Sequence, residues 1–242
     1  MSTRQHYIEV RGLPIEVVRK DIKNLHVGVY PPQGRIRVAA PLRINDEAVR
    51  LAIISRLSWI RRQQAHFTDQ DRQSQREFVN GESHFFQGRR YRLNVVKHDG
   101  PTCVRLSNNR TIQLFAGHQT GRNKHEEVFQ QWYRETLQKQ IPHLLAKWTT
   151  KVGVRVNEVR IRRMKTRWGS CNAHAGRIWL NLELAKKSPV CLEYILVHEM
   201  IHLLERRHNE RFRSLMDTVM PNWRLFREEL NRAPLAHEKW KY

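Results

Sequence analysis

Two histidines and a glutamate in the C-terminal third of the chain have the spacing of a metal site. The run His198-Glu199-Met200-Ile201-His202 matches the pattern H-E-x-x-H. On a helix, residues four apart lie about 40° from each other and one turn along, so both imidazoles can reach a single ion. Glu199 is rotated about 100° from His198, so its carboxylate can face a metal-activated water without binding the metal.

A catalytic zinc site needs a third protein ligand and keeps its fourth position open. His208 lies six residues after His202, which gives H-E-x-x-H-x5-H, the ligand spacing of the metzincins. A straight helix would turn His208 about 240° away from His202, so the helix must end near residues 205–207. Metzincins have a glycine at that turn, whereas this chain has Glu205. Either the turn has another geometry or the third ligand is a different side chain; the alternatives are Glu205, Glu210 and His174.

This ligand set predicts a zinc hydrolase. Three neutral imidazoles leave Zn2+ with its full charge, and a water at the open position drops to a pKa of about 7. Glu199 would take a proton from that water as it attacks a polarised carbonyl, and would pass the proton to the leaving amine. We therefore expect a peptidase with Zn2+ at His198, His202 and His208 and with Glu199 as the general base.

The sequence around this motif predicts an α+β fold. Ser188-Pro189 is typical of a helix start, and the apolar stripe behind it indicates a buried helix over about 189–205. A long aromatic stripe predicts a helix that Pro142 should kink. Strands and helices are expected in the order strand-rich region, helix, hairpin, helices, with the later elements at about 124–149, 154–163, 177–184 and 209–232.

The N-terminal half is predicted to be rich in strands. Alternating apolar residues indicate short strands over 6–40 and again over 78–117, with a helix from Asn45 or Asp46 to about 66 between them. No internal repeat is visible. The polar connector 117–124 is the best boundary, which gives a strand-rich region over 1–120 and a zincin-like domain over 121–242.

Composition narrows the setting of the protein. The net charge is +21, which favours contact with polyanions such as nucleic acid or nucleotides, or is simply a solvated basic surface. Three cysteines without Cys-x-x-Cys spacing argue against a disulfide scaffold and a cysteine zinc ribbon. Neither a secretory signal nor an apolar run of the roughly 20 residues that span a bilayer is visible. We expect a cytoplasmic protein without membrane contact.

Four segments together resemble one known family. They are Lys165–Cys171 with R-W-G-S-C, Arg177–Leu182, Val197–His202 and His208–Phe212. In this order they are similar to the YgjP-like metallopeptidase domain family, which is related to the SprT-like zincins. The resemblance implies a small antiparallel sheet over an active-site helix. It also implies that His198, His202 and His208 are the metal ligands and Glu199 the base.

The R-W-G-S-C box suggests further roles. Arg167 could stabilise an oxyanion or bind a substrate carboxylate or phosphate, with Trp168 beside it. Gly169 allows close backbone approach, so an extended peptide could add as a strand along the cleft. The alternative for Arg167 and Trp168 is a structural stack with a salt bridge. Cys171 could lie near the metal, although a buried thiol is more often inert.

Three functions stay open at this point. The first is cleavage of peptide bonds in a peptide or protein substrate. The second is hydrolysis of a nucleotide or other phosphorylated small molecule at the same site, favoured by the basic residues Arg160, Arg162, Arg163, Lys165 and Arg167. The third is a DNA-associated SprT-like protease or a basic binding module. The sequence has no Walker loop and no Gly-x-Ser-x-Gly elbow, which excludes P-loop chemistry and gives no basis for a serine triad.

Overall fold

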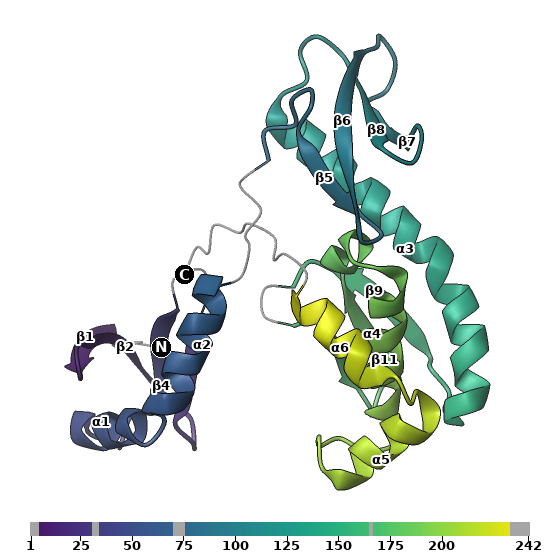
Figure 1. Ribbon diagram of the computed structural model, residues 1–242. Coiled ribbons are helices and arrows are strands. Elements are labelled where there is room, and N and C mark those ends of the chain that lie inside the picture. Colours follow the sequence, from purple (N-terminus) through teal and green to yellow (C-terminus); the bar gives the residue numbers. More distant parts are fainter. Residues whose placement is uncertain (1–4, 31–33, 70–75, 165–166, 233–242) are drawn as a thin grey trace. The chain divides into compact units, whose positions relative to one another are not determined.

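The structure, a computed structural model, describes residues 5–30, 34–69, 76–164 and 167–232. It divides into two compact units, Met1–Asp71 and Arg72–Tyr242 (Figure 1). Each unit contains strands and helices, so the fold is α+β as predicted. The predicted boundary at 120/121 lies inside the second unit, because the second half of the strand-rich region shares a hydrophobic core with the helices that follow it.

The first unit is a four-stranded sheet packed with two helices. The parallel pair β2 and β4 lies at its centre, and β1 and β3 flank it antiparallel. Val49, Ile53 and Ile60 of the helices complete the hydrophobic core of this unit. The single helix expected to run to about 66 is two helices, and the Ser55 hydroxyl at the break donates to the Ala52 carbonyl. The elements are β1 (Gln5–Val10), β2 (Leu13–Lys20), β3 (His26–Tyr30), β4 (Arg35–Pro41), α1 (Asp46–Ile54) and α2 (Leu57–Asp69).

The same strand arrangement recurs at the start of the second unit. Its first sheet has the order β5-β6-β8-β7, again with a parallel central pair and antiparallel outer pairs. The first hairpin of each sheet turns through two residues of positive φ, Arg11-Gly12 and Gln87-Gly88. The expectation that the chain has no internal repeat is therefore wrong for the backbone. The strands are β5 (Ser83–Phe86), β6 (Arg89–Lys97), β7 (Cys103–Leu106) and β8 (Thr111–Ala116).

A 31-residue helix, α3 (Arg122–Val152), joins the two parts of the second unit. It continues through Pro142, and its buried stripe follows the predicted aromatic positions. Near its start, the Tyr133 hydroxyl donates to the Phe85 carbonyl of β5 at 2.9 Å. Near its end, Trp148 Nε1 donates to Glu193 of the next long helix at 2.7 Å. The helix therefore ties the sheet to the part of the unit that carries the H-E-x-x-H motif (Figure 1).

The sheet beside that motif has three strands in the order β10-β11-β9. β10 pairs antiparallel with β11, but β9 pairs with β11 in parallel, so the wholly antiparallel sheet implied by the family resemblance is a mixed one. β10 and β9 lie on opposite sides of β11. The chain runs through β11 in the same direction as through β9 and in the opposite direction to β10. The strands are β9 (Glu158–Arg162), β10 (Gly169–Asn172) and β11 (Arg177–Asn181).

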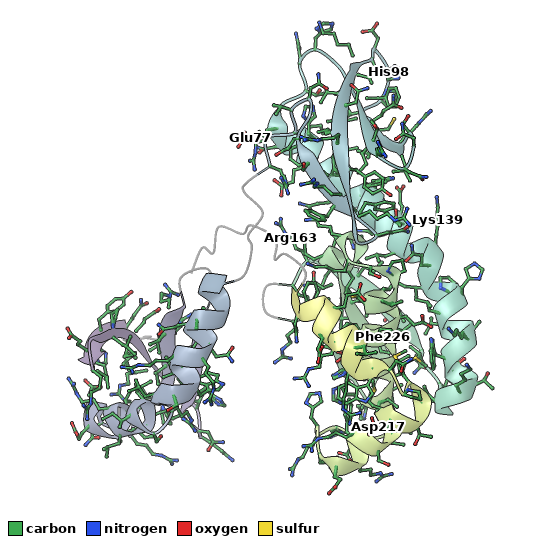
Figure 2. The ribbon with its side chains drawn as sticks, viewed as in Figure 1. Glu77, His98, Lys139, Arg163, Asp217 and Phe226 are labelled. Carbon is green, nitrogen blue, oxygen red and sulfur yellow. The ribbon has the colours of Figure 1, made fainter. Side chains whose placement is uncertain are left out.

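Helices complete the second unit after β11. A break at Pro221 and Asn222 separates the last two helices. Asp217, labelled in Figure 2, ties them together by accepting from Trp223 Nε1 at 2.7 Å and from the Arg224 guanidinium at 2.5 Å. None of the helices in the described residues is long and apolar enough to cross a membrane. The helices are η1 (Leu182–Lys186, a 3-10 helix), α4 (Pro189–Ile201), α5 (Glu210–Val219) and α6 (Trp223–Arg232).

Candidate active site

The helix α4 carries the H-E-x-x-H motif at its C-terminal end. Pro189 occupies its first turn, as expected for a residue whose missing N–H costs nothing there. Most of the helix is buried in the core of the second unit, and its fully enclosed apolar residues hold it in place on several sides. Glu199 is only 5% exposed and His198 is half-buried. Both polar side chains therefore sit in a largely apolar setting that fixes their position.

The helix ends at Ile201, four residues earlier than about 205, and this early end allows the chain to turn back so that His208 reaches the motif. The N–H groups of Leu203 and Leu204 donate to carbonyls three residues back, at 3.0 and 2.9 Å, which tightens the last turn. Glu205 then accepts from the N–H of Arg207 at 3.1 Å. Asn209 starts the next helix by accepting from the N–H of Phe212 at 3.0 Å. The chain thus turns back without the glycine of the metzincin pattern.

The turn brings three imidazoles into one cluster. The ring centroids of His198, His202 and His208 lie 4.7–4.9 Å apart, and one ligand atom from each lies within 4.8 Å of the others. Nε2 of His198 and Nε2 of His208 are 2.9 Å apart. Nδ1 of His202 lies 3.0 Å from the Glu205 carbonyl, which leaves its Nε2 for the cluster. Phe212 packs against all three rings at 4.8–4.9 Å.

The alternative ligands do not join this cluster in the described residues. The group of side chains that could share an ion there consists of the three histidines. Glu205 contributes its backbone carbonyl to His202 rather than its carboxylate. Cys171 and His174 line the same cleft but lie outside the group.

Burial sets the protonation of the cluster. Desolvation, followed by the neighbouring His202 and His208, lowers the pKa of His198 to about 3. Desolvation also lowers the pKa of His208. Both rings are therefore neutral at physiological pH, the form in which imidazole binds metals. Nδ1 of His198 is buried without a hydrogen-bond partner in the described part of the chain.

Burial also raises the pKa values of Glu199 and Cys171. Desolvation raises the pKa of Glu199 to about 8, and the Arg167 guanidinium opposes that rise. Desolvation and the nearby Glu199 raise the pKa of the Cys171 thiol to about 11. The thiol is therefore protonated at neutral pH. A divalent cation near Glu199 would favour its carboxylate form.

Gly169 packs directly against the Glu199 side chain. A Cβ at this position would lie 2.6 Å from Oε1, 2.7 Å from Cγ and 2.9 Å from Cδ of Glu199. Real Cβ atoms essentially never approach heavy atoms closer than 3.0 Å, so no other residue type fits without moving the carboxylate. The close approach expected of this glycine is therefore made to the candidate base itself.

Asn181 holds the segment that precedes β10. Its Nδ2 donates to the carbonyls of Met164 and Arg167, both at 2.8 Å. Its Oδ1 accepts from the N–H groups of Met164 and Glu183 at 3.3 and 3.2 Å. Every hydrogen-bonding position of this 4% exposed amide is used. Asn181 belongs to the Arg177–Leu182 segment of the family resemblance, but no role was predicted for this buried polar residue at the end of β11.

The histidine cluster opens into a cleft of about 990 Å³. Arg167 and Trp168 both line it, and Trp168 is stacked by Lys187, whose Nζ lies 5.3 Å from the ring centroid. The structural stack considered for the box thus involves Lys187, and Arg167 faces the cleft. No role was predicted for three more residues that line the cleft: Tyr194 on α4, Arg206 in the turn after it, and Arg227 on α6, far from the motif in sequence.

Comparison with known proteins identifies the group. The family model for the YgjP-like metallopeptidase domain matches residues 24–233. The chain belongs to this family. A crystal structure of the metallopeptidase zymogen abylysin from Pyrococcus abyssi shares 23% identity, covers 37% of this chain and 90% of its own, and has a TM-score of 0.35. No curated protein matches. Membership of the YgjP-like family supports a metal-dependent peptidase.

Proposed function

We propose that this YgjP-like protein is a zinc-dependent peptidase. His198, His202 and His208 would bind the ion, and Glu199 would be the general base. The observation that carries the proposal is the convergence of three ligand nitrogens within 4.8 Å, with Glu199 one residue along the same helix. The arrangement of α4, the β9–β11 sheet and α5 also supports the zincin-like fold for this part of the chain.

The donor set fits zinc better than the other common ions. Three imidazoles are typical of zinc, whereas Mg2+ and Ca2+ take oxygen ligands. Because the described cluster offers three protein ligands, a fourth position is left for water or substrate. Zinc bound there would lower the pKa of a water molecule to about 7 and would polarise a carbonyl group.

Glu199 has the position and the basicity for proton transfer. Its burial raises the pKa of the carboxyl group to about 8 without the cation, so it can accept a proton from an attacking water. It would then pass that proton to the leaving amine, whose departure completes the cleavage. Because Gly169 fills the space beside the carboxylate, the side chain has one direction to face, which supports the transfer by fixed orientation.

β10 and the residues before it would bind the substrate. β10 is an edge strand of its sheet and lines the cleft, so an extended peptide can pair with its free edge. Arg167 lies where its charge reaches Glu199, and it would stabilise an oxyanion or bind a carboxylate of the substrate. Trp168, held by Lys187, would form the apolar wall beside it.

The basic run before β10 gives little support to the nucleotide alternative. Arg160 forms an ion pair with Glu158, and Arg163 pairs with Glu126 at 3.2 Å. Arg162 lies over the Trp179 ring, 4.7 Å from its centroid. Lys165 lies outside the described residues. These engaged side chains are not arranged around the cleft, so peptide cleavage is the function we propose, and a reducing compartment such as the cytoplasm suits its three free cysteines.

Metal content and activity together test the proposal. Elemental mass spectrometry of the purified protein should find one zinc ion per chain. The variant His208→Ala should lose most of this zinc. Glu199→Gln should keep the zinc and lose peptidase activity by about 10²–10⁴-fold, since it removes the base alone. Glu210→Gln, a matched change at an exposed position outside the cluster, should keep both. Full activity in Glu199→Gln would refute the mechanism.

A further inference from the structure

Three arginine side chains that line the cleft have no carboxylate partner among the residues that the structure describes. Arg167 precedes β10, Arg206 lies in the turn after α4, and Arg227 belongs to α6. Among the described residues, none of their guanidinium groups makes a hydrogen bond or ion pair. The neighbouring sheet differs, because Arg160 and Arg177 there share Glu158 as a partner.

The cleft contains almost no acidic groups to balance these charges. Glu199 is the one carboxylate among the described residues that line it. Arg167 lies close enough to act electrostatically on Glu199, and Arg227 acts in the same way on His198 and His208. Two of the three positive charges, those of Arg167 and Arg227, therefore act on the candidate reacting groups. A concave surface with one sign of charge concentrates ligands of the opposite sign.

Guanidinium groups bind carboxylates with particular strength. The planar fork of arginine matches the two oxygens of a carboxylate and forms short, charge-assisted bonds. Because the three groups come from separate elements around a cleft beside an edge strand, they suit several anions spaced along an extended chain. A peptide with acidic side chains has that distribution of charge.

We propose that the cleft selects peptide segments with aspartate or glutamate side chains near the scissile bond, and that Arg167, Arg206 and Arg227 bind them. This selectivity rests on the proposed peptidase function and names its substrate class. The acidic side chains would provide the partners that the three guanidinium groups lack within the described part of the chain.

Matched peptides test the selectivity. Three peptides of one sequence would differ only in the residues flanking the cleaved bond, which are Asp/Glu, Asn/Gln or Lys. The acidic peptide should be cleaved with a kcat/KM at least about tenfold above that of the neutral one. The lysine peptide should be the poorest of the three. The advantage of the acidic peptide should shrink as salt rises, because exposed charges are screened.

Arginine variants assign the effect to the cleft. Arg206→Gln and Arg227→Gln should each reduce the acidic-to-neutral ratio of kcat/KM several-fold. Arg227→Glu should move the preference toward the lysine peptide. Arg213→Gln removes the same charge from an exposed position of α5 that does not line the cleft, so it should keep the wild-type ratio. The assignment would be overturned if the acidic-to-neutral ratio stayed at the wild-type value in Arg206→Gln and Arg227→Gln but fell in Arg213→Gln.

Binding without turnover separates this inference from the peptidase proposal. Fluorescence anisotropy would follow a labelled acidic peptide on zinc-loaded Glu199→Gln and on the same variant carrying Arg227→Gln. If wild-type protein cleaves peptides without regard to their charge, the selectivity fails and the peptidase stands. If no peptide is cleaved but the acidic peptide binds through Arg227, the peptidase fails and the selectivity stands. Failure of the acidic peptide to bind, with a nucleoside triphosphate binding in its place, would overturn the selectivity.

Discussion

The contact between Gly169 and Glu199 makes the substitution Gly169→Ala a sharp test of how the base is positioned. The new methyl carbon would lie 2.6 Å from Oε1, about 0.8 Å short of the 3.4 Å at which such contacts become ordinary. The atoms it meets belong to a side chain rather than to backbone, so Glu199 can give way. We expect the carboxylate to move while β10 and α4 stay in place.

The size of the effect follows from that displacement. A shift of about 1 Å in a reacting group can reduce a rate by about 10²-fold. We therefore expect kcat to fall by about 100-fold in Gly169→Ala, equivalent to about 2.7 kcal/mol of activation free energy. Zinc content should stay at the wild-type value, because the methyl group meets none of the three histidines among its nearest atoms. The melting temperature should change little for the same reason.

The assay compares kcat, bound zinc and melting temperature in one preparation. Gly121→Ala is the matched control, because a Cβ there meets no atom within 4 Å and the residue lies at the start of α3. It should keep wild-type kcat. Wild-type kcat in Gly169→Ala would show that Glu199 need not hold its position, which would refute the reasoning. Loss of zinc in Gly169→Ala would refute it too, since the defect would then lie in the ligands.

Two further substitutions test the support around the cleft. Burial lowers the pKa of Lys187 from 10.5, its value in the unfolded chain, to about 8 in the folded protein. The nearby Glu183 carboxylate opposes this shift. Below pH 8, keeping Lys187 charged therefore lowers the free energy of unfolding by about 3 kcal/mol. This destabilisation disappears as the pH rises to 10.5. Lys187→Met should thus raise the free energy of unfolding at pH 7 by up to that amount in urea titrations, and should give no gain near pH 10.5. Asn181→Ala should lower the free energy of unfolding by roughly 3 kcal/mol, because it leaves the carbonyls of Met164 and Arg167 unpaired, and it should raise KM. A stability change under 1 kcal/mol in that variant would contradict the role of Asn181.

The local chemistry of the motif was predictable from its spacing. H-E-x-x-H requires a helix to bring its two imidazoles together, and the apolar residues before it identify that helix as buried. The sequence predicted that the chain must turn back for His208 to join the cluster, but not how it does so. How the chain turns depends on tightened hydrogen bonds at Leu203 and Leu204 and on the cap at Asn209. Those contacts follow from the packing of α5, which no local pattern encodes.

The domain organisation was much harder to predict. The two four-stranded sheets share an order and a turn geometry, but matched positions such as Ile15 and Leu93 keep only their apolar character. The second sheet is bound to the catalytic part by backbone contacts, since the N–H groups of Gln87 and Gly88 donate to the carbonyls of Ala185 and Lys186 at 2.9 and 3.1 Å. Backbone contacts leave no residue type to recognise. The boundary therefore falls before β5 and not at the polar connector near 120.

The features that escaped prediction are also those that a stable fold would avoid. A carboxyl group whose pKa burial raises to about 8 and a lysine that is 5% exposed both cost stability in isolation. Such local conflicts mark places where function opposes folding. In the proposed peptidase, burial of Glu199 would strengthen the base, and Lys187 would hold Trp168 at the wall of the cleft. The cleft arginines, which have no partner among the described residues, would leave positive charge for a substrate to neutralise. If this reasoning holds, substitutions that relieve each conflict should stabilise the fold or leave its stability unchanged, and those at Glu199 and the cleft arginines should also reduce turnover of an acidic peptide.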